Sequence, residues 1–197
     1  NLSTGRRDAV HPDAELVVGE FGDAALVKDL LASRGVDAII HFAAKIVVPE
    51  SVSDPLGYYL NNTASARTLL ACAVESGVKH FIFSSTAAVY GEPERNPVQE
   101  DEPTRPINPY GRSKLMVEWM LADAARAHPL SYAALRYFNV AGADPKGRSG
   151  QSTPNATHLI KVAAQTAAGA SQPTGWQVMG AAMQAGNQVQ AWAVCAR

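Results

Sequence analysis

The stretch VKHFIFSST, residues 78–86, decides the fold of this chain. It is almost continuously apolar until a hydroxyl-rich end, which is the pattern of a strand in the interior of a parallel sheet. Two other stretches share this character, VDAIIHF (36–42) and SYAALRYFNV (131–140). We therefore predict three β-strands that are buried on both faces.

Helical patterns alternate with these strands. Residues 23–35 and 55–77 each carry a helical pattern that ends in glycine, and the pattern over 113–129 ends in proline. Strand and helix in alternation predict parallel β-α-β units, with helices on both faces of one sheet. The predicted fold class is α/β, a doubly wound parallel sheet.

Composition excludes several classes of protein. Of the 197 residues 47% are hydrophobic and 18% are charged, which is typical of a globular chain. A net charge of −1 gives no general attraction to nucleic acid or to an anionic membrane, so neither is expected as a partner. Two cysteines, Cys72 and Cys195, have no metal-ligand spacing. We expect no bound metal and a reducing, cytoplasmic location.

Two segments lack a periodic pattern. Residues 91–109 are rich in proline and acidic side chains and are predicted to form a long surface loop, with its run 100–102 (Glu-Asp-Glu) in solvent. Residues 171–197 contain no Asp, Glu or Lys but five Gln. We interpret residues 1–170 as one domain and 171–197 as an atypical tail that is disordered or read out of frame.

Four conspicuous side chains are interpreted as structural. His41 is expected to be a packed histidine at a strand end, and Cys72 a small core residue. Trp119 and Met120 are expected on the core face of the last helix.

Tyr110, Lys114 and Thr86 are the candidate catalytic residues. Tyr110 and Lys114 are four positions apart on a predicted helix and therefore share one face. A tyrosine titrates near pH ~10, and a nearby ammonium group favours its ionised form. Such a tyrosine can take a proton from an alcohol. Thr86 ends a strand, where ligands bind in open parallel sheets, and its hydroxyl can hold the substrate oxygen.

Four blocks of sequence, in order and spacing, resemble the UDP-glucose 4-epimerases of the extended short-chain dehydrogenase/reductase group. The resemblance covers about residues 1–165 and implies a Rossmann-like fold. It also implies NAD as cofactor and a UDP-sugar whose C4 is inverted through a 4-keto intermediate. The blocks are HFAAKIVVPESVSDPLGYYLNNT (41–63), FIFSSTAAVYGE (81–92), NPYGRSKLMVEWML (108–121) and LRYFNVAGADP (135–145).

The resemblance assigns roles residue by residue. Tyr110 is then the base, Lys114 also contacts the nicotinamide ribose, and Thr86 contacts the sugar 4-oxygen. Tyr137 belongs to a segment that contacts both ligands. The implied cofactor-binding residues are Asn1, Leu2, Ser3, Thr4, Gly5, Glu20, Phe21, Phe42, Ala43, Ala44, Lys45, Ile46, Asn61, Tyr110, Lys114 and Phe138. The implied substrate-binding residues are Thr86, Tyr110, Asn139, His158 and Leu159.

Two parts that the resemblance implies are not found in this sequence. The glycine-rich turn that holds the pyrophosphate would precede Asn1, and the sugar domain would follow residue 170 or so. We therefore expect a fragment whose sheet is incomplete at the N-terminus and which has no turnover alone. The complete enzyme is expected to be a homodimer that associates through helices 55–77 and 112–127.

Two alternative functions are weighed against epimerisation. A nucleotide-sugar dehydratase or reductase would share the fold, but a dehydratase needs an added acid and base. The resemblance to such enzymes would place them as Asp-Glu after Thr86, where Ala87 and Ala88 stand. A non-catalytic dinucleotide-binding protein would not need the set of Thr86, Tyr110 and Lys114. The sequence leaves the sugar pair open between glucose/galactose and the N-acetyl forms.

Overall fold

The computed structural model describes residues 1–140, 142, 144, 146, 159–160 and 162–163. The predicted tail, 171–197, lies outside these residues. The chain divides into two compact units, one of Asn1 with Val17–Phe138 and one of Leu2–Leu16 with the chain from Asn139 onward. In the second unit, Arg7–Ala9 form a short 3₁₀ helix. None of the described helices has both the length and the apolar character that crossing a bilayer requires.

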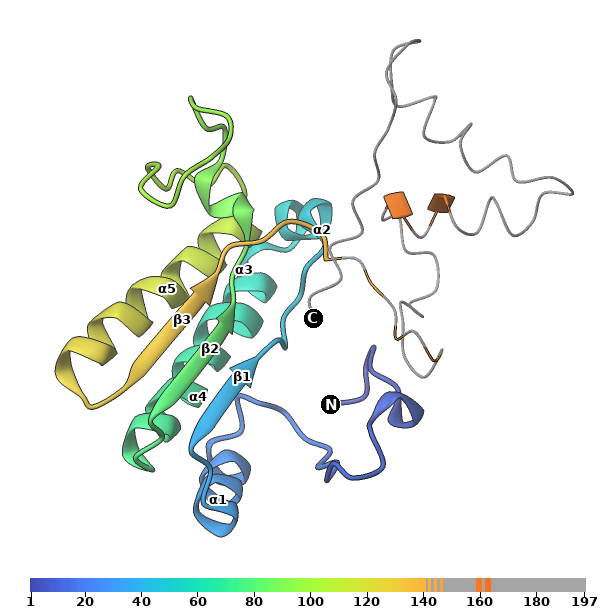
Figure 1. Ribbon diagram of the computed structural model, residues 1–197, viewed down its shortest axis with the longest axis vertical. Helices are drawn as coiled ribbons and strands as arrows, with labels where there is room; N and C mark the ends of the chain where they lie inside the picture. Colours follow the sequence, from blue (N-terminus) through green and yellow to red (C-terminus); the bar gives the residue numbers. More distant parts are fainter. Residues whose placement is uncertain (141, 143, 145, 147–158, 161, 164–197) are drawn as a thin grey trace, which may run out of the picture. The chain divides into compact units, whose positions relative to one another are not determined.

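The first unit alternates helices and strands (Figure 1). Its elements are α1 (Ala24–Arg34), β1 (Ala38–His41), α2 (Val48–Ser53), α3 (Pro55–Tyr58), a π-helical segment (Tyr59–Ala64), α4 (Ser65–Glu75), β2 (His80–Ser84), a 3₁₀ helix (Ala87–Tyr90), α5 (Pro109–Ala127) and β3 (Ser131–Leu135).

The three strands form one parallel sheet in the order β1-β2-β3. Ile40, Ile82 and Ala133 lie side by side in its register, and Ser84 pairs with Leu135 near the carboxyl end. The predicted parallel α/β arrangement is confirmed. Because all three strands run the same way, their carboxyl ends lie at one edge of the sheet.

Capping residues decide where the helices begin and end. The Asp23 carboxylate accepts hydrogen bonds from the backbone N–H groups of Ala25 and Leu26, and α1 ends at Gly35 with a left-handed φ of 58°. Asn108 caps α5 by accepting from the N–H of Gly111 at 2.8 Å, with a proline in the first helical position. The helix thus starts four residues before the predicted 113, so Tyr110 lies in its first turn.

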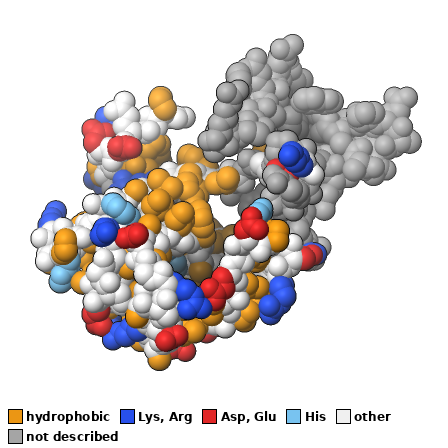
Figure 2. Space-filling view, turned by 60° about the horizontal axis from the view of Figure 1, so that its bottom comes forward, with side chains coloured by type: hydrophobic (Ala, Val, Ile, Leu, Met, Phe, Trp, Pro, Cys, Tyr) orange, Lys and Arg blue, Asp and Glu red, His pale blue; other side chains and the backbone are white. Residues whose placement is uncertain are grey.

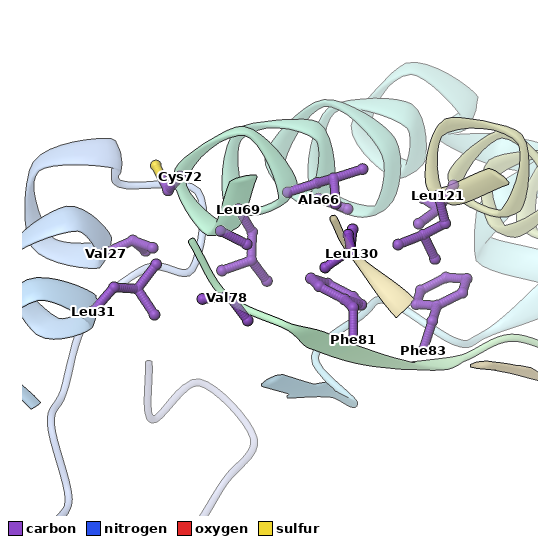
Figure 3. Packing of buried hydrophobic residues seen from close by; sticks show 13 residues of the cluster. Val27, Leu31, Ala66, Leu69, Cys72, Val78, Phe81, Phe83, Leu121 and Leu130 are labelled. Carbon is purple, nitrogen blue, oxygen red and sulfur yellow. The ribbon is translucent and has the colours of Figure 1, made fainter. Parts of the chain in front are cut away.

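The hydrophobic core lies between the sheet and one layer of helices. Figure 3 shows Phe81 and Phe83 of β2 facing the buried side chains of the helices, which include Leu69 on α4 and Leu121 on α5. The α1 side chain of Leu31 joins the same cluster. Cys72 is 1% exposed in this cluster, as expected for a small core residue.

The opposite face of the sheet is open in the described part of the chain. The side chains of Ile40 on β1 and Leu135 on β3 are 57% and 42% exposed. The prediction of strands buried on both faces is therefore wrong for β1 and β3 here, because α1, α4 and α5 all pack into a single cluster on the other face. Figure 2 shows hydrophobic side chains gathered on the surface of the described part.

Three local predictions need correction. The helix expected over 55–77 contains a π-helical segment between α3 and α4. Trp119 was expected in the core but is 57% exposed, whereas its neighbour Met120 packs against the core. Glu102 was expected in solvent but is buried, because its carboxylate accepts a hydrogen bond from Arg95 Nε at 2.7 Å as the loop folds back on itself.

Candidate active site

Thr86 and Tyr110 meet at the carboxyl end of β2. Thr86 follows the strand and is buried, with its hydroxyl accepting a hydrogen bond from the N–H of Ala88 at 3.1 Å. Tyr110 is half-buried in the first turn of α5, and its phenol interacts with the side chain of Thr86. The structure thus brings together the two hydroxyl groups that the sequence predicted to act on one oxygen.

Lys114 lies one turn further along α5 and is almost completely buried. Its Nζ donates to the carbonyl oxygen of Ser84 at 2.8 Å and lies 4.9 Å from the centroid of the Phe83 ring. Burial disfavours the charged ammonium group and lowers the pKa of Lys114 to about 8. The lysine therefore reaches the end of β2 from the same helix that carries Tyr110.

The pKa of Tyr110 reflects two opposing influences. Burial raises the pKa of the phenol above its usual value, because the ionised form loses hydration. The interaction with the Thr86 side chain lowers the pKa, and the nearby Tyr137 raises it. In this geometry the ionised tyrosine therefore depends on polar partners at the strand end. That Lys114 lowers the pKa of Tyr110 stays a prediction.

The backbone of the segment after β1 is held by hydrogen bonds, and most of its side chains are exposed. The N–H of Val47 donates to the Tyr58 hydroxyl at 2.9 Å, and the same hydroxyl lies 2.8 Å from the Glu50 carboxylate. Phe42 and Ile46 are exposed, as is Ala43, whereas Ala44 and Lys45 are half-buried. The five predicted cofactor-lining residues thus form an accessible strand-end segment with a defined path.

His41 ends β1 and is packed among aromatic rings. Its ring lies 4.9 Å from that of Phe21 and 5.8 Å from that of Phe83, measured between centroids. Burial, and then the charge of Lys114, lower the pKa of His41 to about 4. The imidazole is therefore neutral at neutral pH, which agrees with its interpretation as a packed strand-end histidine.

The N-terminal candidates are divided between the two units. In the first unit, Asn1 Nδ2 donates to the Glu20 carboxylate at 2.7 Å, with both residues exposed, and Phe21 contacts His41. The other four N-terminal candidates, residues 2–5, belong to the second unit and are exposed. The predicted cofactor contacts of those four residues stay predictions.

The candidates after β3 are also divided. The Tyr137 hydroxyl donates to Ser84 Oγ at 2.5 Å, so this side chain reaches the end of β2. Phe138 is 80% exposed. Asn139 and Leu159 are exposed and belong to the second unit, and His158 lies outside the described residues. The proposed substrate contacts of these last three residues stay predictions.

Comparison with known proteins shows the family. The model of the NAD dependent epimerase/dehydratase family matches residues 1–192. The chain belongs to this family. The match extends beyond the region of about 1–165 in which the sequence motifs were found.

The relatives of this epimerase-family chain include UDP-glucose 4-epimerases. The enzyme of Azospirillum brasilense is 57% identical over 173 residues, which are 88% of this chain and 50% of that protein. A crystal structure of the Brucella ovis UDP-glucose 4-epimerase in complex with NAD is 46% identical, with a TM-score of 0.81, over 86% of this chain and 52% of that one. A further UDP-glucose 4-epimerase structure has a TM-score of 0.82 at 42% identity, over 85% of this chain and 51% of its own. The chain spans about half the length of the relatives it matches.

Asn62 is a site residue of this epimerase-family chain that sequence reasoning missed. Its side chain is buried in the π-helical segment and bonds both backbone groups of Lys45, accepting from the N–H at 2.8 Å and donating to the carbonyl at 2.9 Å. It also donates to Ser113 Oγ at 3.1 Å, and Ser113 donates to the Tyr110 carbonyl at 2.7 Å. Asn62 therefore links the segment after β1 to the turn that carries Tyr110.

Asn61, which the sequence singled out, is half-buried and donates to Asn62 Oδ1 at 2.9 Å. No local sequence signal marks Asn62, because only the structure shows that it lies in a π-helical segment. Both asparagines lie in the π-helical segment, and such segments occur frequently at functional sites.

Proposed function

We propose that this chain supplies the catalytic residues of an NAD-dependent UDP-hexose 4-epimerase, an isomerase of the galactose branch of carbohydrate metabolism. One observation carries the proposal. The side chains of Thr86 and Tyr110 interact at the carboxyl end of β2, with Lys114 buried beside that strand end, in a chain 57% identical to a UDP-glucose 4-epimerase.

The reaction assigns a separate task to each of the three side chains. Ionised Tyr110 takes the proton of the sugar 4-hydroxyl, while Thr86 holds that oxygen in place. Lys114 supplies positive charge that favours the phenolate against the cost of burial. The chemistry that NAD supplies when bound is acceptance of hydride from C4 and its return to the opposite face of the 4-keto sugar.

The described residues fit a dinucleotide at this edge of the sheet. Ala43 is exposed and Ala44 half-buried, and such small side chains allow a ligand to approach the backbone closely. Lys114 and His41 both contact the ring of Phe83, so the lysine lies next to the end of β1 as well as that of β2. We propose that Lys114, Asn61 and the Phe42–Ile46 segment hold the nicotinamide end.

Further residues are assigned to the cofactor and the sugar by the same proposal. Glu20, Phe21 and Phe138 would contact the cofactor within the first unit. As the family resemblance implies, Leu2, Ser3, Thr4 and Gly5 would contact the cofactor, and Asn139, His158 and Leu159 would contact the UDP-sugar.

The residues after Thr86 argue against dehydration. Elimination of water requires a second acid and base close to the sugar, and Ala87 and Ala88 begin the 3₁₀ helix that follows Thr86. Neither side chain can transfer a proton. With NAD bound, the proposed epimerisation uses no side chains as proton donor, proton acceptor or charge other than Thr86, Tyr110 and Lys114.

The exposed apolar helix surface supports the proposal of a homodimer. Leu56 and Leu60 are exposed in the helical run after Pro55, and Trp119 is exposed on α5. These positions fall in the two helices, 55–77 and 112–127, that we expect to associate. A cytoplasmic location is part of the proposal and rests on the small number and wide spacing of the two cysteines in the sequence.

The experiment uses a chimera in which this chain is completed with the segments of the A. brasilense relative that it does not cover. We expect bound NAD, detected by absorbance after denaturation, and conversion of UDP-galactose to UDP-glucose. The 197-residue chain alone is expected to retain no NAD and to turn over no substrate. A folded chimera without NAD or turnover would overturn the proposal.

A further inference from the structure

Glu118 is a buried carboxylate on the helix that carries Tyr110 and Lys114, and none of the roles above uses it. It lies one turn beyond Lys114 and is 6% exposed. Its carboxylate accepts a hydrogen bond from Arg136 at 2.6 Å, a second from the Nε of the same guanidinium at 3.0 Å, and one from the hydroxyl of Ser85. Three elements therefore meet at this group: α5, the end of β2 and the end of β3.

Arg136 is held in place on its other side. Its NH1 donates to the Tyr90 hydroxyl at 3.0 Å, and its guanidinium lies 5.0 Å from the centroid of that ring. A buried carboxylate remains charged only when it is well paired, and a two-point contact with arginine is among the strongest pairings available. The pair with Arg136 thus fixes the orientation of the Glu118 carboxylate, which accepts the hydrogen bond from the hydroxyl of Ser85.

Ser85 stands between two residues of the candidate active site. The carbonyl of Ser84 accepts from Lys114, and the side chain of Thr86 interacts with Tyr110. The side chain of Ser85 is directed to Glu118, so the bond between them attaches this tripeptide to α5. Tyr110 and Lys114 are on that same helix. The bond therefore sets the distance between the strand end and both α5 side chains.

We propose that Glu118 is a positioning residue, which holds Ser84–Thr86 against α5 so that the hydroxyls of Thr86 and Tyr110 reach the same substrate oxygen. The proposal rests on the proposed function for its catalytic consequence. Its structural part, that Glu118 restrains the tripeptide, stands independently of that function and can be measured independently.

The first experiment compares Glu118→Gln with Glu75→Gln in the chimera described above. Glu75 on α4 forms an ion pair of the same length, 2.6 Å, with Lys28, but on the surface. We expect Glu118→Gln to lower kcat about 10- to 100-fold, as small displacements of reacting groups do, while KM changes less than about twofold. Glu75→Gln should leave both within about twofold. Equal behaviour of the two variants would overturn the proposal.

A double-mutant cycle separates positioning from general stabilisation. If Glu118 acts through Thr86, Glu118→Gln should have little effect on kcat once Thr86 has been changed to alanine. A residue that only stabilises the fold would lower kcat by the same factor in both backgrounds. That additive result would contradict the proposal. Ser85→Ala keeps the pair of Glu118 with Arg136 and should lower kcat a few-fold. It provides the test if Glu118→Gln does not fold.

Hydrogen–deuterium exchange gives a readout that requires no activity. We expect Glu118→Gln or Ser85→Ala to speed exchange of the amides of 85–88 about tenfold, while the amides of β1 keep their parent rates. Exchange that rises equally everywhere, or nowhere, would overturn the proposal. An inactive parent chimera with selective exchange at 85–88 would reject the proposed function and retain the restraint by Glu118.

Discussion

The carboxyl ends of β2 and β1 are held in different ways. After β2, the side chains of Ser85 and Thr86 are buried. Ser85 donates a hydrogen bond to Glu118 of α5, and Thr86 interacts with Tyr110 of the same helix. After β1, the backbone of Lys45 and Val47 is fixed by Asn62 and Tyr58. The side chains of that segment nevertheless remain accessible.

The two strand ends match different requirements, the positioning of reacting side chains and the lining of a cofactor site. Side chains that must meet one oxygen within a fraction of an ångström gain from full burial and complete pairing. A segment that lines a large cofactor needs a defined backbone, and its apolar side chains gain their burial when the ligand binds. The end of β2 thus resembles a preorganised catalytic site, and the end of β1 resembles one wall of a binding site.

Loss of the base should have the largest effect and tests the β2 side directly. In the chimera, Tyr110→Phe should lower kcat by about 10²–10⁴-fold with little change in KM, because general-base catalysis is lost in the transition state. Steady-state conversion of UDP-galactose measures both constants. Tyr132→Phe, at an exposed position on β3, is the control and should keep kcat within about twofold. A Tyr110→Phe enzyme as active as this control would show that another group is the base.

Replacement of Asn62 should show how much stability comes from its bonds between the segment after β1 and the first turn of α5. Asn62→Ala leaves buried backbone groups of Lys45 without partners, so we expect the free energy of unfolding to fall by about 2–5 kcal/mol. Asn61→Ala, one residue earlier and half-buried, should cost at most about 1 kcal/mol. Urea unfolding of both variants gives the comparison. Similar losses of unfolding free energy in the two variants would mean that Asn62 does not link the segment after β1 to the first turn of α5.

Burial of Lys114 should make stability depend on pH. The pKa of Lys114 is lowered to about 8 in the folded chain, below the usual value of about 10.4, so the unfolded chain binds more protons between these pH values. Stability should therefore rise as pH increases from about 8 to 10, by at most about 3 kcal/mol.

Lys114→Met should remove this rise, because the substituted side chain does not titrate. The measurement is the difference in unfolding free energy between the parent and the variant at pH 7.5 and pH 10, which cancels the titration of other groups. If the parent and the variant differ in unfolding free energy by the same amount at both pH values, the pKa of Lys114 is not lowered by burial. In the chimera, Lys114→Met should also move the onset of activity to higher pH.

The smallest effect is expected at the exposed side of the comparison. Phe42→Ala should change the free energy of unfolding by less than about 0.5 kcal/mol, because the ring is 65% exposed. Phe83→Ala is the matched variant on β2, where the ring is 1% exposed, and should cost about 3–5 kcal/mol. Urea unfolding checks both. A large loss at Phe42 would show that the end of β1 is covered in solution.

The sequence alone was sufficient for features that depend on local geometry. Continuous apolar runs located β1, β2 and β3, and terminal glycines and a proline located the ends of α1, α4 and α5, because these signals act over a few residues. The spacing of Tyr110 and Lys114 placed them on one face of α5 for the same reason. Thr86 could be added because the end of a strand is also a local feature.

The tertiary structure decided which polar groups became buried and which apolar groups did not. Asn62 bonds to Ser113, 51 positions away, and Glu118 bonds to Ser85, 33 positions away. No local pattern marks such partners, since each is one polar residue on a helix until a distant segment covers it. The prediction that Trp119 is a core residue was wrong, because burial of a position on α5 depends on which other segments pack against that side of the helix. Periodicity shows that a helix has an apolar side, whereas only packing shows where that side ends.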